Sequence, residues 1–229
     1  MKLSIIIPVY NEEKTIIEIL KKIENVRHIK KQIIVIDDKS DDRSFELIDS
    51  FNFESEFKII RHDKNSGKGS CIKSAKNFIS GDIVIIQDAD LEYDPTDYDK
   101  LLKPFFKTNA DVVYGSRFRG GSYVRLHFFW HSFANKLLTL VSNIVTNLNM
   151  TDMETGFKVF KSEVIKSINL KEDSFGIEPE ITIKLAKKKF KFYEVAVSYR
   201  GRSYSEGKKI TLKDAFWAVY CILRYRFFD

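Results

Sequence analysis

Two carboxylates stand two residues apart just after an unbroken apolar run. Asp88 and Asp90 follow residues 83–86, which are all Ile or Val and are typical of a strand buried on both faces. Open α/β sheets bind ligands at the carboxyl ends of their strands, and carboxylates suit Mg²⁺ or Mn²⁺. Alternate residues of an extended chain face the same side, so Asp88 and Asp90 predict a metal site beside a diphosphate. Glu92 is a further ligand if the chain stays extended. The alternative is an acidic turn that starts a loop.

A second acidic pair, Asp37 and Asp38, closes a predicted strand at residues 32–36. A carboxylate at that position can accept hydrogen bonds from a ribose hydroxyl or a base N–H. The alternative is that Asp38, Ser40 or Asp41 caps the following helix, and the two roles can coexist.

A glycine-rich turn, Gly67-Lys68-Gly69, opens a predicted helix at residues 71–79. The spacing is not that of a Walker loop. The glycines still let the backbone approach a ligand, and Lys68 can meet a nucleotide or a phosphate. A plain turn remains the alternative.

Five arginines flank the aromatic-rich stretches of the second half: Arg117, Arg119, Arg125, Arg200 and Arg202. Arginine suits bidentate binding of phosphate. Solvated surface arginines are the alternative for at least two of them.

The elements that must position these residues alternate between strand and helix through the first half. Strands are predicted at residues 2–9, 32–36, 57–60, 83–86 and 111–114, and helices at residues 12–25, 40–50, 71–79 and 94–106. Asn11 is placed to cap the first helix. This alternation predicts an α/β fold with a mostly parallel, Rossmann-like sheet and helices on both faces.

The second half is richer in aromatic residues. Helices are predicted at residues 127–149, 178–189 and 211–226, with a short strand within residues 152–160, another at 192–197 and a polar loop at 200–209. The first and last of these helices are amphipathic and place Trp and Phe beside Arg and Lys. Core packing and contact with a membrane interface are both open for them. No linker interrupts the chain, so a single domain at residues 1–229 is expected, with halves at 1–115 and 116–229.

The composition fits some classes of binding partner but does not identify a single one. The net charge is +6 in 229 residues, which fits an anionic partner such as a nucleotide or a phospholipid surface. Nucleic acid is not expected, because no recognition helix, stacking strand or basic arm is present. Cys71 and Cys221 lie far apart without metal or disulfide spacing, which favours a reducing cytoplasm. No signal peptide and no apolar stretch of membrane-spanning length is found.

Several motifs together resemble family 2 glycosyltransferases with the GT-A fold. In the first half they are PVYNE at 8–12, VIDDKS at 35–40, NSGKG at 65–69 and QDADL at 87–91. The second half looks like the dolichyl- or polyprenyl-phosphate mannose synthase branch. Its motifs are YGSRF at 114–118, DMETGFK at 152–158, GIEPE at 176–180, and Arg202 followed by GKKI at 207–210.

The resemblance implies inverting transfer of a sugar, mannose or glucose, from a nucleoside diphosphate to a polyprenyl phosphate with Mg²⁺ or Mn²⁺. It places the nucleotide-sugar pocket at Pro8, Tyr10, Glu12, Asp37, Asp38, Lys68, Asp88, Ala89 and Asp90. The DxD motif is Asp88 and Asp90, and Arg117 and Arg202 match positions near the donor diphosphate and the acceptor phosphate. Glu92 stands where several members carry Gln, so a third carboxylate joins the expected metal site.

The expected mechanism follows from charge. A metal at Asp90 and Asp88 stabilises the leaving diphosphate, with Arg202 or Lys68 sharing the task. A lipid phosphate is already anionic and needs cationic positioning, which Arg117 and Arg125 can give.

Two other functions stay open. A hydroxyl acceptor on a glycan or protein would instead need a carboxylate base, for which Asp152 and Glu180 are the candidates. A non-catalytic module that binds sugar nucleotides or membranes is the third possibility. For the leading hypothesis, the expected location is the cytoplasmic side, peripheral on the inner face of the membrane.

Overall fold

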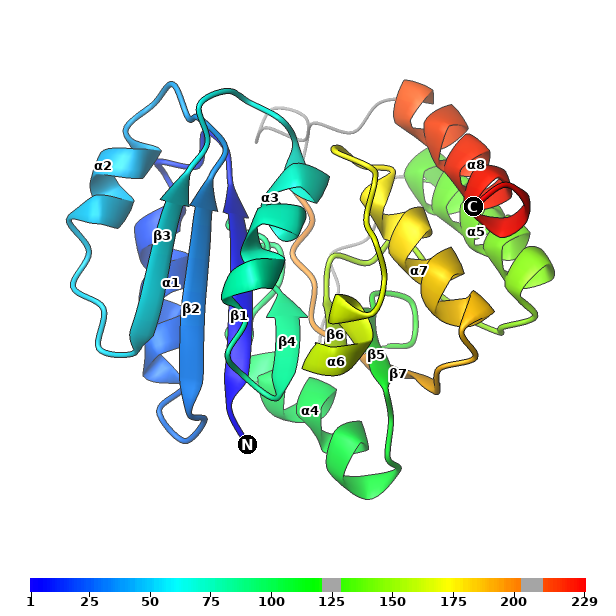
Figure 1. Ribbon diagram of the computed structural model, residues 1–229, viewed down its shortest axis with the longest axis horizontal. Helices are drawn as coiled ribbons and strands as arrows, with labels where there is room; N and C mark the ends of the chain where they lie inside the picture. Colours follow the sequence, from blue (N-terminus) through cyan, green and yellow to red (C-terminus); the bar gives the residue numbers. More distant parts are fainter. Residues whose placement is uncertain (121–128, 203–211) are drawn as a thin grey trace.

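Seven strands form one continuous sheet in the computed structural model, which describes residues 1–120, 129–202 and 212–229 (Figure 1). In chain order the strands are β1 (Leu3–Val9), β2 (Lys31–Asp37), β3 (Glu56–Arg61), β4 (Ile83–Ile86), β5 (Val112–Ser116), β6 (Lys158–Lys161) and β7 (Phe192–Ala196). Their order across the sheet is β3-β2-β1-β4-β6-β5-β7. The expected boundary between the two halves falls inside β5, and both halves contribute strands to this sheet.

All neighbouring pairs are parallel except the two that involve β6. The predicted α/β class with a mostly parallel sheet is therefore confirmed. β6 runs antiparallel between β4 and β5, and Val159 lies opposite Ile85 on one side and Val113 on the other. Because β6 intervenes, the ends of β4 and β5 are two strand spacings apart, or about 10 Å.

Eight α-helices connect and cover the described strands. They are α1 (Ile16–Asn25), α2 (Ser44–Asp49), α3 (Lys68–Ala75), α4 (Tyr98–Lys107), α5 (Phe129–Thr146), α6 (Ser162–Lys166), α7 (Ile177–Lys187) and α8 (Leu212–Phe227). Short 3₁₀ helices at Lys76–Phe78 and Pro95–Asp97 extend α3 and precede α4.

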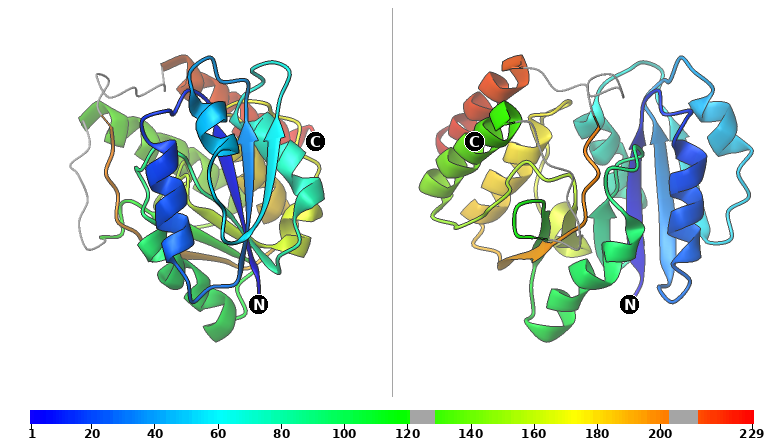
Figure 2. Two further views of the ribbon diagram at one scale, coloured as in Figure 1. Left: turned by 90° about the vertical axis from the view of Figure 1, so that its left-hand side faces the viewer. Right: turned by 180° about the vertical axis from the view of Figure 1, so that it is seen from behind.

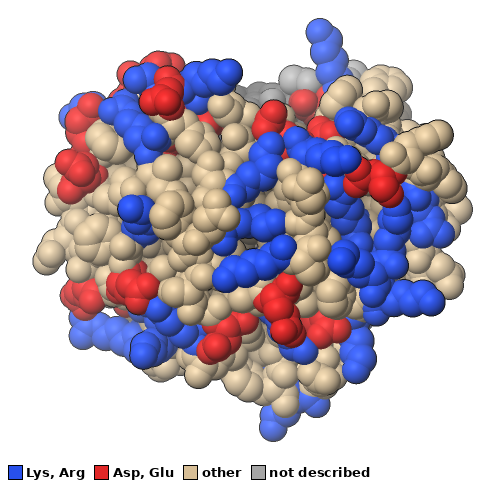
Figure 3. All heavy atoms as spheres, in the orientation of Figure 1, with Lys and Arg blue, Asp and Glu red and all other residues tan. Residues whose placement is uncertain are grey.

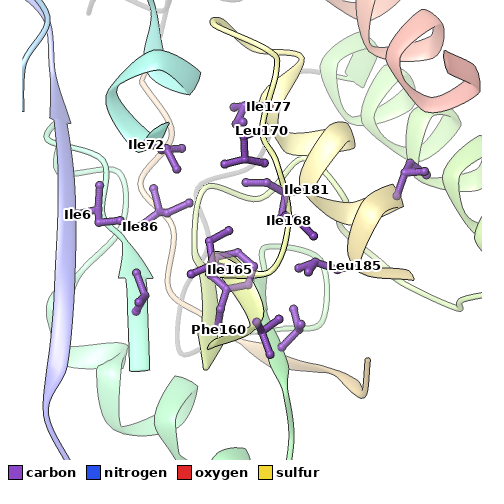
Figure 4. Close-up of a cluster of buried hydrophobic side chains, with 14 of the residues drawn as sticks. Ile6, Ile72, Ile86, Phe160, Ile165, Ile168, Leu170, Ile177, Ile181 and Leu185 are labelled. Atoms are coloured by element: carbon purple, nitrogen blue, oxygen red, sulfur yellow. The ribbon is translucent and has the colours of Figure 1, made fainter. Parts of the chain in front are cut away.

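Helices cover both faces of the sheet because alternate strand residues point in opposite directions. Ile6 belongs to a buried cluster that includes residues of α3, α6 and α7 (Figure 4). Its neighbours Ile5 and Ile7 belong to a second cluster with residues of α1, α2 and α4. Figure 2 shows α1 and α4 on the rear face. The two cores hold the strand ends rigidly, and those ends carry the polar residues singled out above.

α5 and α8 form an outer layer beyond α7. They lie side by side, and α8 packs against both α5 and α7 (Figures 1 and 2). No described helix is both long and apolar enough to cross a membrane.

The predicted start of the first helix is wrong. α1 begins at Ile16, four residues later than expected, and Thr15 precedes it without a side-chain cap. Asn11 does not cap α1. It adopts a positive φ of 53°, and its Oδ1 accepts a hydrogen bond of 2.8 Å from the N–H of Asp41. Residues 10–15 therefore form a loop that is tied to the loop after β2, which positions both beside the strand ends.

Candidate active site

A cleft of about 400 Å³ opens at the carboxyl ends of the parallel strands. Residues that follow β1, β2, β4, β5 and β7 meet there with the loops that precede α3, β6 and α7. The structure brings these predicted residues into the lining: Pro8, Tyr10, Glu12, Asp38, Lys68, Asp88, Ala89, Asp90, Glu92, Arg117 and Arg202. Asp37 and Asp152 lie outside the lining, and Arg125 lies outside the described residues.

The two carboxylates after β4 each meet a cation of the chain. Lys68 Nζ lies 2.7 Å from Asp88 Oδ1, and Arg202 Nη2 lies 2.8 Å from Asp90 Oδ2. Burial, together with the charges of Asp88 and Glu92, raises the pKa of Asp90 to about 7, although Arg202 opposes the shift. Negative charge is therefore crowded at this end of the cleft.

The acidic cluster fits a divalent cation. Asp88 and Asp90 offer oxygen atoms of the kind that Mg²⁺ and Mn²⁺ bind, and a cation would offset the burial and the neighbouring negative charges that raise the pKa of Asp90. Mg²⁺ needs only one or two carboxylates when phosphate and water complete its shell. Asp88 and Asp90 are thus sufficient as protein ligands.

Glu92 holds the segment after β7 against the cleft. Its Oε2 accepts a hydrogen bond of 2.6 Å from Tyr199, and its Oε1 accepts one of 2.8 Å from the backbone N–H of Arg202. The role of Glu92 as a metal ligand stays a prediction.

Arg202 joins the first strand end to the fourth. Besides Asp90, its guanidinium contacts Glu12, with an Nη1–Oε2 distance of 3.2 Å. A cation held between these acids is in position to meet a phosphate that enters the cleft.

The adjacent acids after β2 have different roles. Asp37 is fully buried, and its Oδ2 lies 3.1 Å from Arg61 Nε. Asp38 lines the cleft and accepts hydrogen bonds from the backbone N–H groups of Ser66 and Gly67, at 3.0 and 2.6 Å. The predicted capping of α2 does not occur, because α2 begins at Ser44 without a side-chain cap. Asp38 instead fixes the glycine-rich turn.

His62 supports Asp38 from behind. Its Nδ1 lies 2.7 Å from Asp38 Oδ1 and its Nε2 lies 2.9 Å from Ser74 Oγ. Asp38, His62 and Cys71 bring ligand-type atoms within 4.8 Å of one another. Hydrogen bonds already engage both ring nitrogens of His62, so the cluster serves to hold the turn.

The glycine-rich turn needs its first glycine for two reasons. Gly67 has a φ of +96°, and a β-carbon there would overlap the carbonyl of Asp173. This close approach lets Lys68 begin α3 at the edge of the cleft. The turn is therefore more than a plain connection, and it places Lys68 between two acids.

Lys68 bridges Asp88 to a residue of α7. Its Nζ lies 2.9 Å from Glu178 Oε1, and Glu178 Oε2 lies 3.0 Å from Nζ of the buried Lys158. Burial would lower the pKa of Lys68, but Asp88 and Glu178 outweigh it and raise that pKa. Burial also raises the pKa of Glu178, yet Lys158 and Lys68 bring it below its ordinary value.

Arg117 follows β5 and is held by Asp152. Its Nε and Nη2 donate hydrogen bonds of 2.7 Å to the two carboxylate oxygens, and its backbone N–H donates a third of 3.0 Å. The guanidinium carbon lies 5.3 Å from the centre of the Tyr199 ring. Arg117 therefore presents a fixed positive charge to the cleft.

The two carboxylates considered as general bases both serve structural networks. Asp152 is fully buried beneath Arg117, and Glu180 is fully buried where the N–H groups of Lys171 and Glu172 each donate to it at 2.8 Å. Lys184 Nζ lies 2.6 Å from Glu180. Neither carboxylate belongs to the lining. These positions argue against a role for either in proton removal from a substrate.

The two other described arginines of the predicted set, Arg119 and Arg200, do not line the cleft. Arg119 is half exposed and lies 3.5 Å from Glu194, and Arg200 donates its backbone N–H to the carbonyl of Glu92. Among the described residues of the set, Arg117 and Arg202 are the ones that line the cleft.

Sequence reasoning missed two residues of the loop before β6 that line the cleft. Glu154 has a carboxylate oxygen, Oε1, that is buried without a hydrogen-bond partner among the described residues. Burial is the main cause that raises the pKa of Glu154 to about 7. At Gly156 a β-carbon would overlap Asp88 Oδ2. Both stand in the DMETGFK motif, which was the available signal.

The outer helices expose large apolar side chains. On α5 they include Phe129 and Trp130, at 71% and 72% exposure, and on α8 Phe216 reaches 79%. Among the side chains that the structure describes, the exposed set on the two helices and the chain end is Phe129, Trp130, Phe133, Leu137, Leu140, Ile144, Phe216, Trp217, Tyr220, Leu223, Phe227 and Phe228. We call this set the aromatic face.

Comparison with known proteins adds a family and a fold. Residues 4–168 match the family described as glycosyl transferase family 2. The chain is 32% identical over 217 residues to a dolichol-phosphate mannosyltransferase of Pyrococcus furiosus, covering 92% of this chain and 61% of that protein. It is also 32% identical over 218 residues to an uncharacterised protein of Methanocaldococcus jannaschii, covering 90% of this chain and 93% of the relative.

The fold is similar to that of glucosyl-3-phosphoglycerate synthase from Mycobacterium tuberculosis, crystallised with Mn²⁺, uridine diphosphate and phosphoglyceric acid. The TM-score is 0.76 at 18% identity, and the match covers 100% of this chain and 79% of that one. The likeness shows the expected GT-A fold.

Proposed function

The chain belongs to glycosyl transferase family 2, and from that premise we propose that it transfers a sugar from a nucleoside diphosphate to a polyprenyl phosphate. The observation that carries the proposal is Arg117, held rigidly by the buried Asp152 in the same cleft as the Asp88 and Asp90 pair. The mannosyltransferase relative from Pyrococcus supports this acceptor class, and mannose or glucose is the proposed sugar.

The donor enters at the ends of β1, β2 and β4. Tyr10 and Asp38 line the nucleoside side, and Asp88, Asp90, Lys68 and Arg202 surround the place of the diphosphate. Asp88 and Asp90 would hold Mg²⁺ or Mn²⁺, which supplies Lewis-acid stabilisation of the leaving diphosphate when bound. The complex of the Mycobacterium protein with Mn²⁺ and uridine diphosphate supports this arrangement.

The acceptor phosphate binds at Arg117. A phosphate is already anionic near neutral pH, so it attacks the anomeric carbon without a general base. This agrees with the burial of Asp152 and Glu180 away from the lining. Strands β4 and β5, which precede these acids and Arg117, are two strand spacings apart in the sheet, or about 10 Å. That separation leaves room for a sugar between leaving group and nucleophile, as inversion of the anomeric carbon requires.

The lipid chain reaches the cleft from a membrane surface. Exposed Trp and Phe beside Arg and Lys are typical of helices that lie in the membrane interface, and α5 and α8 carry both. We place the aromatic face in the inner, cytoplasmic face of the membrane, so that the protein is peripheral there.

The test supplies a panel of labelled nucleoside diphosphate sugars and a divalent cation together with polyprenyl phosphate in detergent and, as a competing acceptor, a soluble glycan. We expect label in the organic phase with wild-type protein and at least a 100-fold lower rate with Asp90→Asn. An exposed control, Glu163→Gln, should transfer normally. Label that reaches only a soluble glycan, or an Asp90→Asn variant with full activity, would refute the proposal.

A second candidate is transfer to a hydroxyl of a glycan or protein. Glu154 is the observation that favours it, because a carboxyl with a pKa of about 7 in the cleft suits proton removal. The experiment with Glu154 variants described below distinguishes a general base from a residue that only binds the substrate.

A further inference from the structure

Glu154 lines the cleft and carries a buried acceptor atom, Oε1, without a hydrogen-bond partner among the described residues. A buried polar atom without a partner is destabilising, and more so if it is charged. Such an atom in a ligand cleft indicates that the partner comes with the ligand.

The backbone around Glu154 is fixed. Nζ of the buried Lys158 donates hydrogen bonds to the carbonyls of Met153 and Thr155, the two neighbours of Glu154, at 2.8 and 2.5 Å. The N–H of Met153 donates to Thr139 Oγ1 of α5 at 3.1 Å. The carboxyl is therefore presented to the cleft from a rigid support, as a recognition group should be.

Glu154 lies between the two ends of the reaction path. Its charged neighbours include Glu178, which holds Lys68 beside Asp88, and Arg117, which is the proposed site of the acceptor phosphate. A sugar in transfer must occupy the space between these two ends. Glu154 is thus placed beside the sugar and away from Asp38 at the nucleoside side.

We propose that Glu154 accepts a hydrogen bond from a hydroxyl of the transferred sugar and so helps to determine which sugar is used. This inference rests on the proposed function, because it takes the donor to be a sugar nucleotide. A hydroxyl fits better than a phosphate, since a carboxylate repels a phosphate. It also fits better than a metal ion, since Glu154 joins no three-ligand group among the described residues.

The experiment compares binding of a sugar nucleotide with binding of the same nucleoside diphosphate without sugar, by calorimetry in the presence of Mn²⁺. The proteins are the full chain as wild type, Glu154→Gln, Glu154→Ala and the exposed control Glu163→Gln. The sugar nucleotide is the one that wild type binds most tightly among uridine and guanosine diphosphate glucose and mannose. Single-deoxy analogues of that sugar complete the set.

We expect Glu154→Gln and Glu154→Ala to bind the sugar nucleotide about 10- to 100-fold more weakly, with unchanged binding of the free diphosphate. Wild type should bind one of the deoxy analogues more weakly than the complete sugar nucleotide, by a similar factor. Glu154→Ala should bind that analogue and the complete sugar nucleotide equally well. Transfer rates should show the same selectivity change.

Equal losses for sugar nucleotide and free diphosphate would overturn the inference, because they indicate a structural role. Unchanged binding with a large loss of kcat would also overturn it, and would favour a general base and a hydroxyl acceptor. If wild type binds no sugar nucleotide at all, the proposed function fails as well. Because the binding arms contain no acceptor, a wrong acceptor leaves this inference standing.

Discussion

At the scale of single residues, the cleft works through charges that other side chains hold in place. Arg117 is joined to Asp152 by hydrogen bonds of 2.7, 2.7 and 3.0 Å, so little side-chain entropy remains to be lost when a phosphate binds. Lys68 shows the complementary case. It is shared between Asp88 and Glu178, and a diphosphate at Asp88 would give it a new partner without removing the old one.

Replacing Arg117 by Lys tests the acceptor site with the charge retained. Lysine cannot make the bidentate contact that the Arg117 guanidinium makes with Asp152. We therefore expect kcat/KM for the lipid phosphate to fall about 100-fold while KM for the donor stays unchanged. Steady-state kinetics with each substrate varied in turn gives the answer. Arg119→Lys, at a half-exposed arginine outside the lining, is the matched control and should behave as wild type.

Glu154 gives a prediction of stability against pH. Its pKa is about 7 in the folded protein and 4.5 ordinarily, so the neutral carboxyl stabilises the fold below pH 4.5. That contribution is lost as the pH rises through 7, because the unfolded chain binds fewer protons than the folded one in this window.

Denaturant unfolding of wild type and Glu154→Gln at several pH values measures the effect. Relative to the variant, wild type should lose on the order of 2–3 kcal/mol between pH 4.5 and 8. Parallel stability curves for the two proteins would show that Glu154 has an ordinary pKa.

At the scale of elements, the loop that precedes β6 does most to build the side of the cleft where we propose that the acceptor binds. Asp152 holds Arg117, Glu154 enters the cleft, and Gly156 leaves space for Asp88. The N–H of Gly156 also donates to Tyr93 Oη at 2.9 Å. Because β6 follows directly, the antiparallel strand anchors this loop between the ends of β4 and β5.

Gly156→Ala tests the fit of that loop against Asp88. The added methyl must displace the Asp88 carboxylate, and a misplaced catalytic group can cost about 100-fold in rate. We expect that loss in transfer together with weaker Mn²⁺ binding, followed by electron paramagnetic resonance. The exposed control Glu163→Gln should keep normal transfer and Mn²⁺ binding. Full activity of Gly156→Ala would mean that Asp88 tolerates displacement.

The sequence predicts the helices and strands better than it predicts which distant residues contact one another. The apolar run at 83–86 is β4, and the alternation of strand and helix correctly indicates the parallel sheet. The reversed direction of β6 and the short α6 carry no local signal, because both depend on contacts with distant strands. The start of α1 was misplaced since Asn11 bonds to Asp41, 30 residues away.

The same limit applies to the candidate site. Asp37 and Asp38 are adjacent residues of the same type, so the sequence cannot tell their roles apart. Asp37 forms a buried ion pair with Arg61, whereas Asp38 lines the cleft and binds the turn at Gly67. Asp152 resembled a base until its pairing with Arg117 was seen. Glu154 has no periodicity or spacing that separates it from an ordinary polar loop residue.

At the scale of the whole molecule, the aromatic face is connected to the cleft by short paths. Asn135 of α5 donates to Asp152 at 3.3 Å, beside Arg117. On α8, Trp217 Nε1 and Tyr225 Oη donate to Glu172 at 2.9 and 2.6 Å. Next to Glu172, Asp173 accepts from the N–H of Ser70 in α3 at 3.0 Å. Both outer helices are thus fixed relative to the donor and acceptor ends.

Charge on the visible surface agrees with an anionic partner. In Figure 3, Lys and Arg side chains gather over the middle and right of the molecule, where Figure 1 places α3, α6 and α7. The protein has a net charge of +6 and carries the aromatic face in addition to these basic residues. An anionic membrane surface would attract the basic residues.

The double variant Trp130→Ser/Phe216→Ser tests the membrane surface. Each aromatic side chain contributes about 1.5–3 kcal/mol when fully buried, so we expect at least about 10-fold weaker partitioning to anionic phospholipid vesicles. Vesicle sedimentation measures it. Phe106→Ser, at a 64% exposed residue of α4 on the rear face, should leave partitioning unchanged. Equal effects of both variants would remove the special role of the aromatic face.

The most direct test of the whole account compares two acceptors that differ in one group. Polyprenyl phosphate and the corresponding polyprenol are supplied separately with the preferred sugar nucleotide, and the lipids are analysed by mass spectrometry. An acceptor site built on Arg117 without a general base predicts one added hexose on the phosphate and none on the alcohol. Addition of hexose to the alcohol at a comparable rate would contradict it.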